Sequence, residues 1–92
     1  MADKNYVYLF ATGMVNPFLK KSRKAVEIIT SQEGFMAIHP AAPHGMLWVF
    51  DSLNNAKGAR NVAESKGIKC GRNIMRGWID GDTLEVEDKA DG

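Results

Sequence analysis

Five consecutive apolar residues, Met46-Leu47-Trp48-Val49-Phe50, constrain the fold of this chain more than any other stretch. Gly45 precedes the run and Asp51-Ser52 follow it. The run is too short for a helix, and aromatic and β-branched residues between turn formers are typical of a strand buried on both faces. Such a strand needs cover on both sides. The run therefore predicts a sheet whose one face is covered by the domain's own helices and whose other face is covered by something that the sequence does not identify.

Four other segments are predicted to be strands. Residues 6–11 are apolar throughout, and residues 35–39 precede a short connection that contains Pro40 and Pro43. This connection predicts that the second and third strands pair as a hairpin. Residues 73–79 form the fourth predicted strand. After the tight-turn dipeptide Asp80-Gly81, residues 83–87 alternate polar and apolar side chains, as expected of a half-exposed edge strand.

Two helices are predicted from capping residues and apolar periodicity. Asn16-Pro17 is typical of a helix start, and Gly34 is expected to end this helix in a left-handed conformation. Ser52 is expected to cap a second helix over residues 53–66, which Gly67 ends. The residues expected to face the sheet recur at helical spacing. They are Phe18, Ser22, Ala25, Val26 and Ile29 in the first helix and Leu53, Ala56, Ala59 and Ala63 in the second.

The element order βαββαβ, followed by one more strand, predicts an α+β domain of ferredoxin-like topology over residues 1–87. In this arrangement two helices cover one face of an antiparallel sheet, and the first and third strands are neighbours at its centre. The additional strand forms a C-terminal β-hairpin with the strand before it. Residues 88–92 are expected to be a flexible acidic tail.

The two central strands each carry one aliphatic and one bulky side, because side chains alternate along a strand. The aliphatic sides are expected to face the helices, which leaves the bulky sides on the open face of the sheet. An exposed apolar patch of this size normally marks an interaction site. The expected partner-binding residues are Tyr6, Tyr8, Phe10, Met46, Trp48 and Phe50.

Composition and charge limit the class of protein. With 92 residues, 45% of them hydrophobic and 25% charged, the chain is expected to be one globular domain. Its single cysteine and the lack of a signal-peptide pattern favour a cytoplasmic protein. Residues 1–76 carry eleven basic and five acidic residues, or +6, whereas residues 77–92 carry one basic and six acidic residues, or −5. This asymmetry fits either a polyanion-binding body with an acidic end or two solvated surfaces.

The expected topology and the aromatic residues together resemble RNA-recognition-motif domains, which stack bases on their first and third strands. Val7-Tyr8-Leu9 is similar to the first signature of that family, and His44-Gly45-Met46-Leu47-Trp48-Val49 is partly similar to the second. Met46 stands in place of an aromatic residue and Leu47 in place of a small one. The resemblance implies that Tyr8 and Trp48 stack on single-stranded RNA or DNA while Lys20, Lys21, Arg72 and Arg76 contact phosphates.

No catalytic set is predicted. His39, His44 and Cys70 lack a recognised metal-ligand spacing, and Asp80, Asp82 and Glu85 are better explained by a tight turn than by a calcium loop. The chain is therefore expected to be neither an enzyme nor a holder of a metal or cofactor, with no membrane or small-molecule partner. In its small size and lack of catalytic residues it also looks like accessory proteins of phages and mobile elements, some of which inhibit host defence systems.

Two functions remain open on the sequence. The first is a protein-binding module that engages a second copy or a foreign protein, as an inhibitor or regulator does. The second is a single-stranded nucleic-acid binder of the RNA-recognition-motif type.

Overall fold

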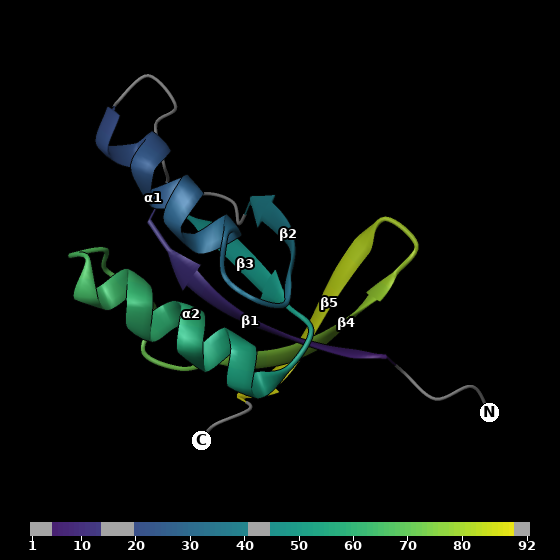
Figure 1. Ribbon diagram of the computed structural model, residues 1–92. Helices are drawn as coiled ribbons and strands as arrows, with labels where there is room; N and C mark the ends of the chain where they lie inside the picture. Colours follow the sequence, from purple (N-terminus) through teal and green to yellow (C-terminus); the bar gives the residue numbers. More distant parts are fainter. Residues whose placement is uncertain (1–4, 14–19, 41–44, 90–92) are drawn as a thin grey trace.

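The computed structural model describes residues 5–13, 20–40 and 45–89, and for residues 21, 22, 88 and 89 only the backbone. This part of the chain is an α+β fold in which two helices pack on a curled antiparallel sheet (Figure 1). In chain order the elements are β1 (Tyr6–Thr12), α1 (Lys20–Thr30), β2 (Phe35–Pro40), β3 (Met46–Phe50), α2 (Leu53–Ser65), β4 (Met75–Asp80) and β5 (Thr83–Lys89).

The five strands lie in the order β2-β3-β1-β4-β5, and every neighbouring pair is antiparallel. Leu9 of β1 pairs with Val49 of β3 on one side and with Met75 of β4 on the other. The predicted pairing of the first and third strands is confirmed, and so is the β2–β3 hairpin. As predicted, the last strand lies at an edge.

The helices follow the capping signals in the sequence. Ser52 caps α2 by accepting a hydrogen bond from the backbone N–H of Asn55 at 3.2 Å, and Gly67 takes a left-handed φ of +86° just past the helix end. Gly34 also has the predicted left-handed conformation, with a φ of +82°, although α1 ends four residues earlier, at Thr30. The expected start of α1 at Asn16-Pro17 lies outside the described residues.

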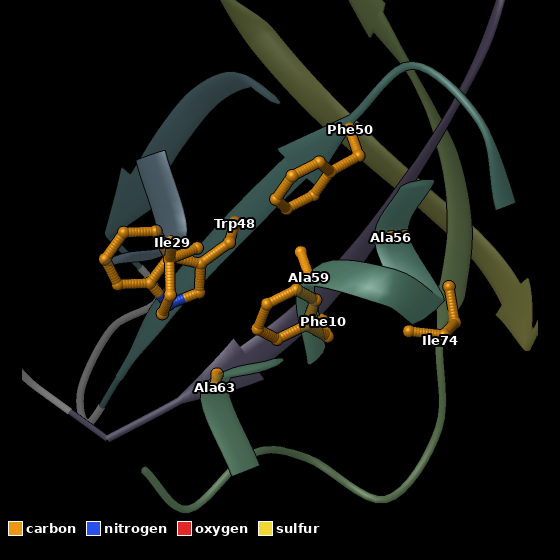
Figure 2. Packing of buried hydrophobic residues seen from close by; sticks show 8 residues of the cluster. All are labelled: Phe10, Ile29, Trp48, Phe50, Ala56, Ala59, Ala63 and Ile74. Carbon is orange, nitrogen blue, oxygen red and sulfur yellow. The ribbon is translucent and has the colours of Figure 1, made fainter. Parts of the chain in front are cut away.

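The main hydrophobic core lies between the helices and the sheet and contains the aromatic side chains of the central strands (Figure 2). Phe10 and Phe50 stack with ring centroids 5.8 Å apart, and Phe35 meets Phe50 edge to face. From the helices, α1 contributes Ile29 and α2 contributes three small side chains. These are Ala56, Ala59 and Ala63, which are buried as the sequence predicts.

The predicted orientation of the sheet is therefore wrong: its aromatic side faces the helices. The physical reason is that the small side chains of α2 require large side chains from the sheet opposite them. Helix α2 presents alanines to the sheet, so large side chains from β1 and β3 must fill the space between the two layers at normal packing density. Trp48, at 0% exposure, is the largest of them, and Phe10 and Phe50 are also fully buried.

The aliphatic side of the sheet holds a smaller cluster of Val7, Leu9 and Val49, all buried. Leu84 of β5 packs against this cluster, together with Ala37, Leu47 and Met75. The curl of the sheet brings β5 towards this side, so β5 adds to the cover that the two helices cannot give. Strand β5 also continues to Lys89, two residues beyond its predicted end at residue 87.

Candidate functional site

Exposed apolar side chains concentrate at one end of the sheet. Among the described residues, four large apolar side chains are exposed: Tyr6 at 39%, Ile79 at 42%, Val86 at 45% and Met36 at 48%. The first three lie on β1, β4 and β5, whereas Met36 lies on β2 at the opposite edge. An exposed apolar side chain needs no explanation when it is single, but a group on neighbouring strands does.

Ile79 and Val86 belong to the hairpin formed by β4 and β5, which extends away from both helices (Figure 1), and Tyr6 lies on the neighbouring strand β1. The pairing register assigns side chains to its two sides. Tyr6, Trp78 and Glu85 lie in one row across β1, β4 and β5, on the side that faces the helices elsewhere in the sheet. Ile79, Leu84 and Val86 lie on the opposite, aliphatic side. We use the name hairpin surface for both sides of this region, which comprises Tyr6, Arg76, Trp78, Ile79, Asp80, Asp82, Leu84, Glu85, Val86 and Glu87.

An aromatic and charged cluster forms the first side of the hairpin surface. Tyr6 and Trp78 meet edge to face with ring centroids 6.4 Å apart, and the guanidinium carbon of Arg76 lies 4.5 Å from the centroid of the Tyr6 ring. Arg76 Nε also donates a hydrogen bond to Glu87 Oε2 at 3.2 Å. The Glu87 carboxylate raises the pKa of Arg76 above its ordinary value, so this side chain stays charged.

Gly77 fixes how closely β4 and β5 approach. It is buried, and a Cβ atom there would collide with the carbonyl oxygen of Glu85. The register shifts between Arg76 and Gly77, which pair with Asp88 and Val86, so Glu87 is the extra residue of a β-bulge. Such bulges bend and twist a strand. The bulge thus brings Glu87 to Arg76 and contributes to the curl of the sheet.

The hairpin surface is acidic as well as apolar. Residues 75–87 contain the carboxylates Asp80, Asp82, Glu85 and Glu87 and a single basic side chain, Arg76. All four acidic residues are exposed. Because the Arg76–Glu87 pair neutralises one of them, three carboxylates remain to set the sign of the local field.

The predicted partner-binding set does not form one surface. Phe10, Trp48 and Phe50 are fully buried under the helices, so their prediction as partner contacts is wrong. Tyr8 and Met46 are half-buried and pack against the same core. Only Tyr6 remains exposed, because β1 begins beyond the cover of the helices, and it lies on the hairpin surface.

The predicted nucleic-acid residues are also separated. Trp48 cannot stack on a base because it has no exposed surface, and Arg76 is paired with Glu87. Lys20 is exposed at the described start of α1, and the side chain of Lys21 lies outside the description. Arg72 is exposed, and its carbonyl oxygen accepts a hydrogen bond from Arg60.

The histidine and cysteine considered as metal ligands lie on opposite faces of the sheet. His39 pairs with Leu47 on the aliphatic side, whereas Cys70 bridges to Thr12 and packs against the core beneath the helices. They cannot share an ion, and His44 lies outside the described residues. Within the ranges that the structure describes, no group of three or more metal-ligating side chains is found. Partial burial, with Glu64 nearby, raises the pKa of the Cys70 thiol to about 11.

Sequence reasoning missed Trp78, Ile79 and Val86. The signal for Trp78 lay in the predicted topology, which places the fourth strand beside the first and so brings Trp78 to Tyr6. The signal for Ile79 and Val86 lay in the alternation of residues 79–86 around a tight turn. An apolar residue near the tip of an edge hairpin has few neighbours that could cover it.

Across the ranges included in the structure, no helix is both long and apolar enough to cross a membrane. Comparisons with protein-family models, curated proteins and solved structures give no match.

Proposed function

We propose that this chain is a non-catalytic binding domain that engages a protein partner through the hairpin surface. One observation carries the proposal: of the four large apolar side chains exposed among the described residues, two, Ile79 and Val86, lie on the same side of a hairpin that extends beyond the helices, and a third, Tyr6, lies on the adjacent strand β1. Aromatic and aliphatic side chains of this kind supply the contact area of protein–protein interfaces. The strand order β2-β3-β1-β4, extended by β5, supports a ferredoxin-like classification for the domain.

The charge of the hairpin surface indicates the sign of the charge on the partner's surface. Exposed carboxylates at Asp80, Asp82 and Glu85 lie on the same hairpin as Ile79 and Val86. Complementary potentials guide association and exclude partners of the wrong sign. We therefore infer a basic partner surface that buries Ile79 and Val86, which lie on the same side of the hairpin. An inhibitor or regulator of a larger basic protein fits this role, because it needs contact area and charge and no catalytic residues.

Nucleic acid does not suit this surface. Although Tyr6, Arg76 and Trp78 combine aromatic rings with a cation, Glu87 already binds the guanidinium and Glu85 lies in the same row. Carboxylates at these positions would repel a phosphate backbone. Binding of an oligonucleotide at low salt, with quenching of Trp78 fluorescence, would favour the nucleic-acid alternative over the proposal.

The experiment compares two serine variants. Ile79→Ser/Val86→Ser removes apolar contact area from the hairpin surface without changing charge, and Met36→Ser removes an equally exposed apolar side chain from the opposite edge. Proteins recovered from cell extract with the wild-type chain are identified, purified and titrated by calorimetry. We expect the hairpin variant to bind at least ~10-fold more weakly and the Met36 variant to bind as the wild type does. Equal affinity of all three would contradict the proposal.

A further inference from the structure

We propose that the partner contributes an extended basic segment, which pairs as an added strand with the free edge of β5. This inference rests on the proposed function and specifies the form in which the partner binds. Strand β5 has one neighbour, β4, in the described sheet. A strand at the edge of a sheet presents a row of backbone N–H and C=O groups to an incoming chain, and addition of a strand is a recurrent mode of peptide recognition.

The two edges of the sheet differ in how well they can accept a strand. Edge strand β2 ends at Pro40, which has no N–H to donate, and its pairing with β3 is irregular between Phe35 and Ala37. Both features protect an edge from pairing. The pairing of β5 with β4 is also irregular, at Glu87, but residues 83–86 pair regularly with residues 77–80. This segment also contains no proline.

The regular segment of β5 is held in place before any partner arrives. Leu84 packs against the cluster of Val7, Leu9 and Val49, and the Arg76–Glu87 contact ties the two strands together just beyond it. An edge that is already ordered avoids part of the entropic cost of binding. Because Leu84 anchors one side, the backbone of β5 has a fixed position from which to accept a strand.

The side chains of β5 disfavour a second copy of the same chain as the added strand. Glu85 and Glu87 are both exposed. A symmetric antiparallel pair centred on Glu85 would place that carboxylate opposite its own copy. Centring the pair on Val86 would place Glu85 opposite Glu87. Like charges directly opposite each other destabilise a strand pair.

The same side chains favour a strand of alternating basic and apolar residues. Lysine or arginine opposite Glu85 would form a cross-strand ion pair, and apolar residues on the other side would cover Val86 and extend the row that includes Ile79. The carboxylates thus disfavour self-pairing in these two registers and select the partner, which is how specific interfaces combine repulsion with attraction.

The test uses a seven-residue peptide that alternates lysine and valine, with both ends blocked, and a matched peptide in which glutamate replaces lysine. Binding is followed by NMR of the backbone amides of the whole chain. We expect shifts and slowed hydrogen exchange at residues 83–86 with the lysine peptide only. Glu85→Lys should weaken that binding about five- to tenfold. Glu33→Lys makes the same charge change at an exposed site off the hairpin and should leave binding unchanged.

Two further peptides test the backbone contact itself. One carries N-methyl groups on its lysines and the other on its valines. Because alternate residues of an extended peptide point their N–H groups to opposite edges, each peptide loses the N–H groups along one of its two edges. We expect one of them to lose binding and the other to keep it. Equal binding of both would contradict strand addition, and so would equal binding of the lysine and glutamate peptides or the absence of any effect at residues 83–86.

The outcomes separate the two proposals. If the partner's affinity depends on Ile79 and Val86 but the amides of residues 83–86 gain no protection from exchange, the hairpin surface binds a folded surface and strand addition is wrong. If those amides are protected without peptide, in a concentration-dependent manner, the added strand is a second copy and the inference of a basic partner segment is wrong.

Discussion

The indole N–H of Trp48 donates a hydrogen bond to the hydroxyl oxygen of Thr12 at 2.8 Å, across 36 residues of sequence. Thr12 is itself buried, and its hydroxyl donates to the carbonyl oxygen of Gly13 at 2.9 Å. The only polar atom of the largest buried side chain therefore has a partner inside the core. This hydrogen bond and its full burial make Trp48 a structural residue, so it cannot be part of a binding surface.

Replacing Thr12 by valine tests that hydrogen bond. The two side chains have similar shapes, but valine leaves the buried indole N–H of Trp48 without its acceptor, and we expect a loss of about 1–3 kcal/mol in the free energy of unfolding. Urea denaturation measures the loss. Thr12→Ser keeps the hydroxyl and should retain more of the stability. A valine variant as stable as the wild type would show that the hydrogen bond contributes little.

Replacing Gly77 by alanine tests the close approach of β4 and β5. The added Cβ would meet the carbonyl oxygen of Glu85, a backbone atom that cannot move without displacing the strand. We expect a loss of about 1–3 kcal/mol, the usual range for overpacking a tight contact. Hydrogen exchange should accelerate first in β5. Stability within experimental error of the wild type would contradict the described pairing of the two strands.

Gly58 is the matched control for Gly77 and carries the opposite expectation. It lies inside α2, where a Cβ atom meets nothing within 4 Å. Alanine there should raise the free energy of unfolding by about 0.5–1 kcal/mol, because glycine loses more backbone freedom in a helix. Thermal or urea denaturation shows whether the substitution raises or lowers the free energy of unfolding. A destabilised Gly58→Ala variant would mean that the added Cβ meets neighbouring atoms on this face of α2.

The thiol of Cys70 should react slowly with alkylating reagents near neutral pH. Its pKa is raised from 9.0 to about 11, chiefly by burial, so the thiolate fraction at pH 8 falls roughly 100-fold. The folded state holds the thiol proton more tightly than the unfolded state. The associated stability is therefore present below pH 9 and lost as the pH rises towards 11. Iodoacetamide labelling, followed by mass spectrometry from pH 7 to 10, measures the rate at which the Cys70 thiol is alkylated. Labelling of the folded chain at the rate of a free cysteine would contradict it.

Most of the fold could be predicted from the sequence because its local signals agree with one another. Ser52 caps α2, Gly67 follows its end and Gly81 lies in a tight turn, as expected. Gly34 has the expected left-handed conformation, although α1 ends before it. Short apolar runs between these residues leave few alternatives for the strands. Boundaries shifted by one or a few residues, as at the end of β5, where pairing with β4 extends the strand.

The orientation of the sheet could not be predicted, because both sides of β1 and β3 are apolar. Alternation along the strands places Phe10 and Leu9 on opposite sides of the sheet, and likewise Trp48 and Val49, but it does not say which side meets the helices. The deciding information is the volume of the facing layer, which is small because α2 presents alanines. The curl that lets Leu84 cover Val7 and Leu9 arises from pairing geometry, which the sequence pattern does not contain.

Collisional quenching of the two tryptophans by acrylamide tests most directly the claim that the aromatic side of the sheet is core and the binding surface lies on the hairpin. Trp78→Phe leaves Trp48 as the only fluorophore, and Trp48→Phe leaves Trp78. Trp48 is fully buried and Trp78 is partly exposed beside Tyr6. We predict blue-shifted, weakly quenched emission from Trp48 and a quenching constant several-fold larger for Trp78. Strong quenching of Trp48 with protection of Trp78, in folded variants, would contradict the account.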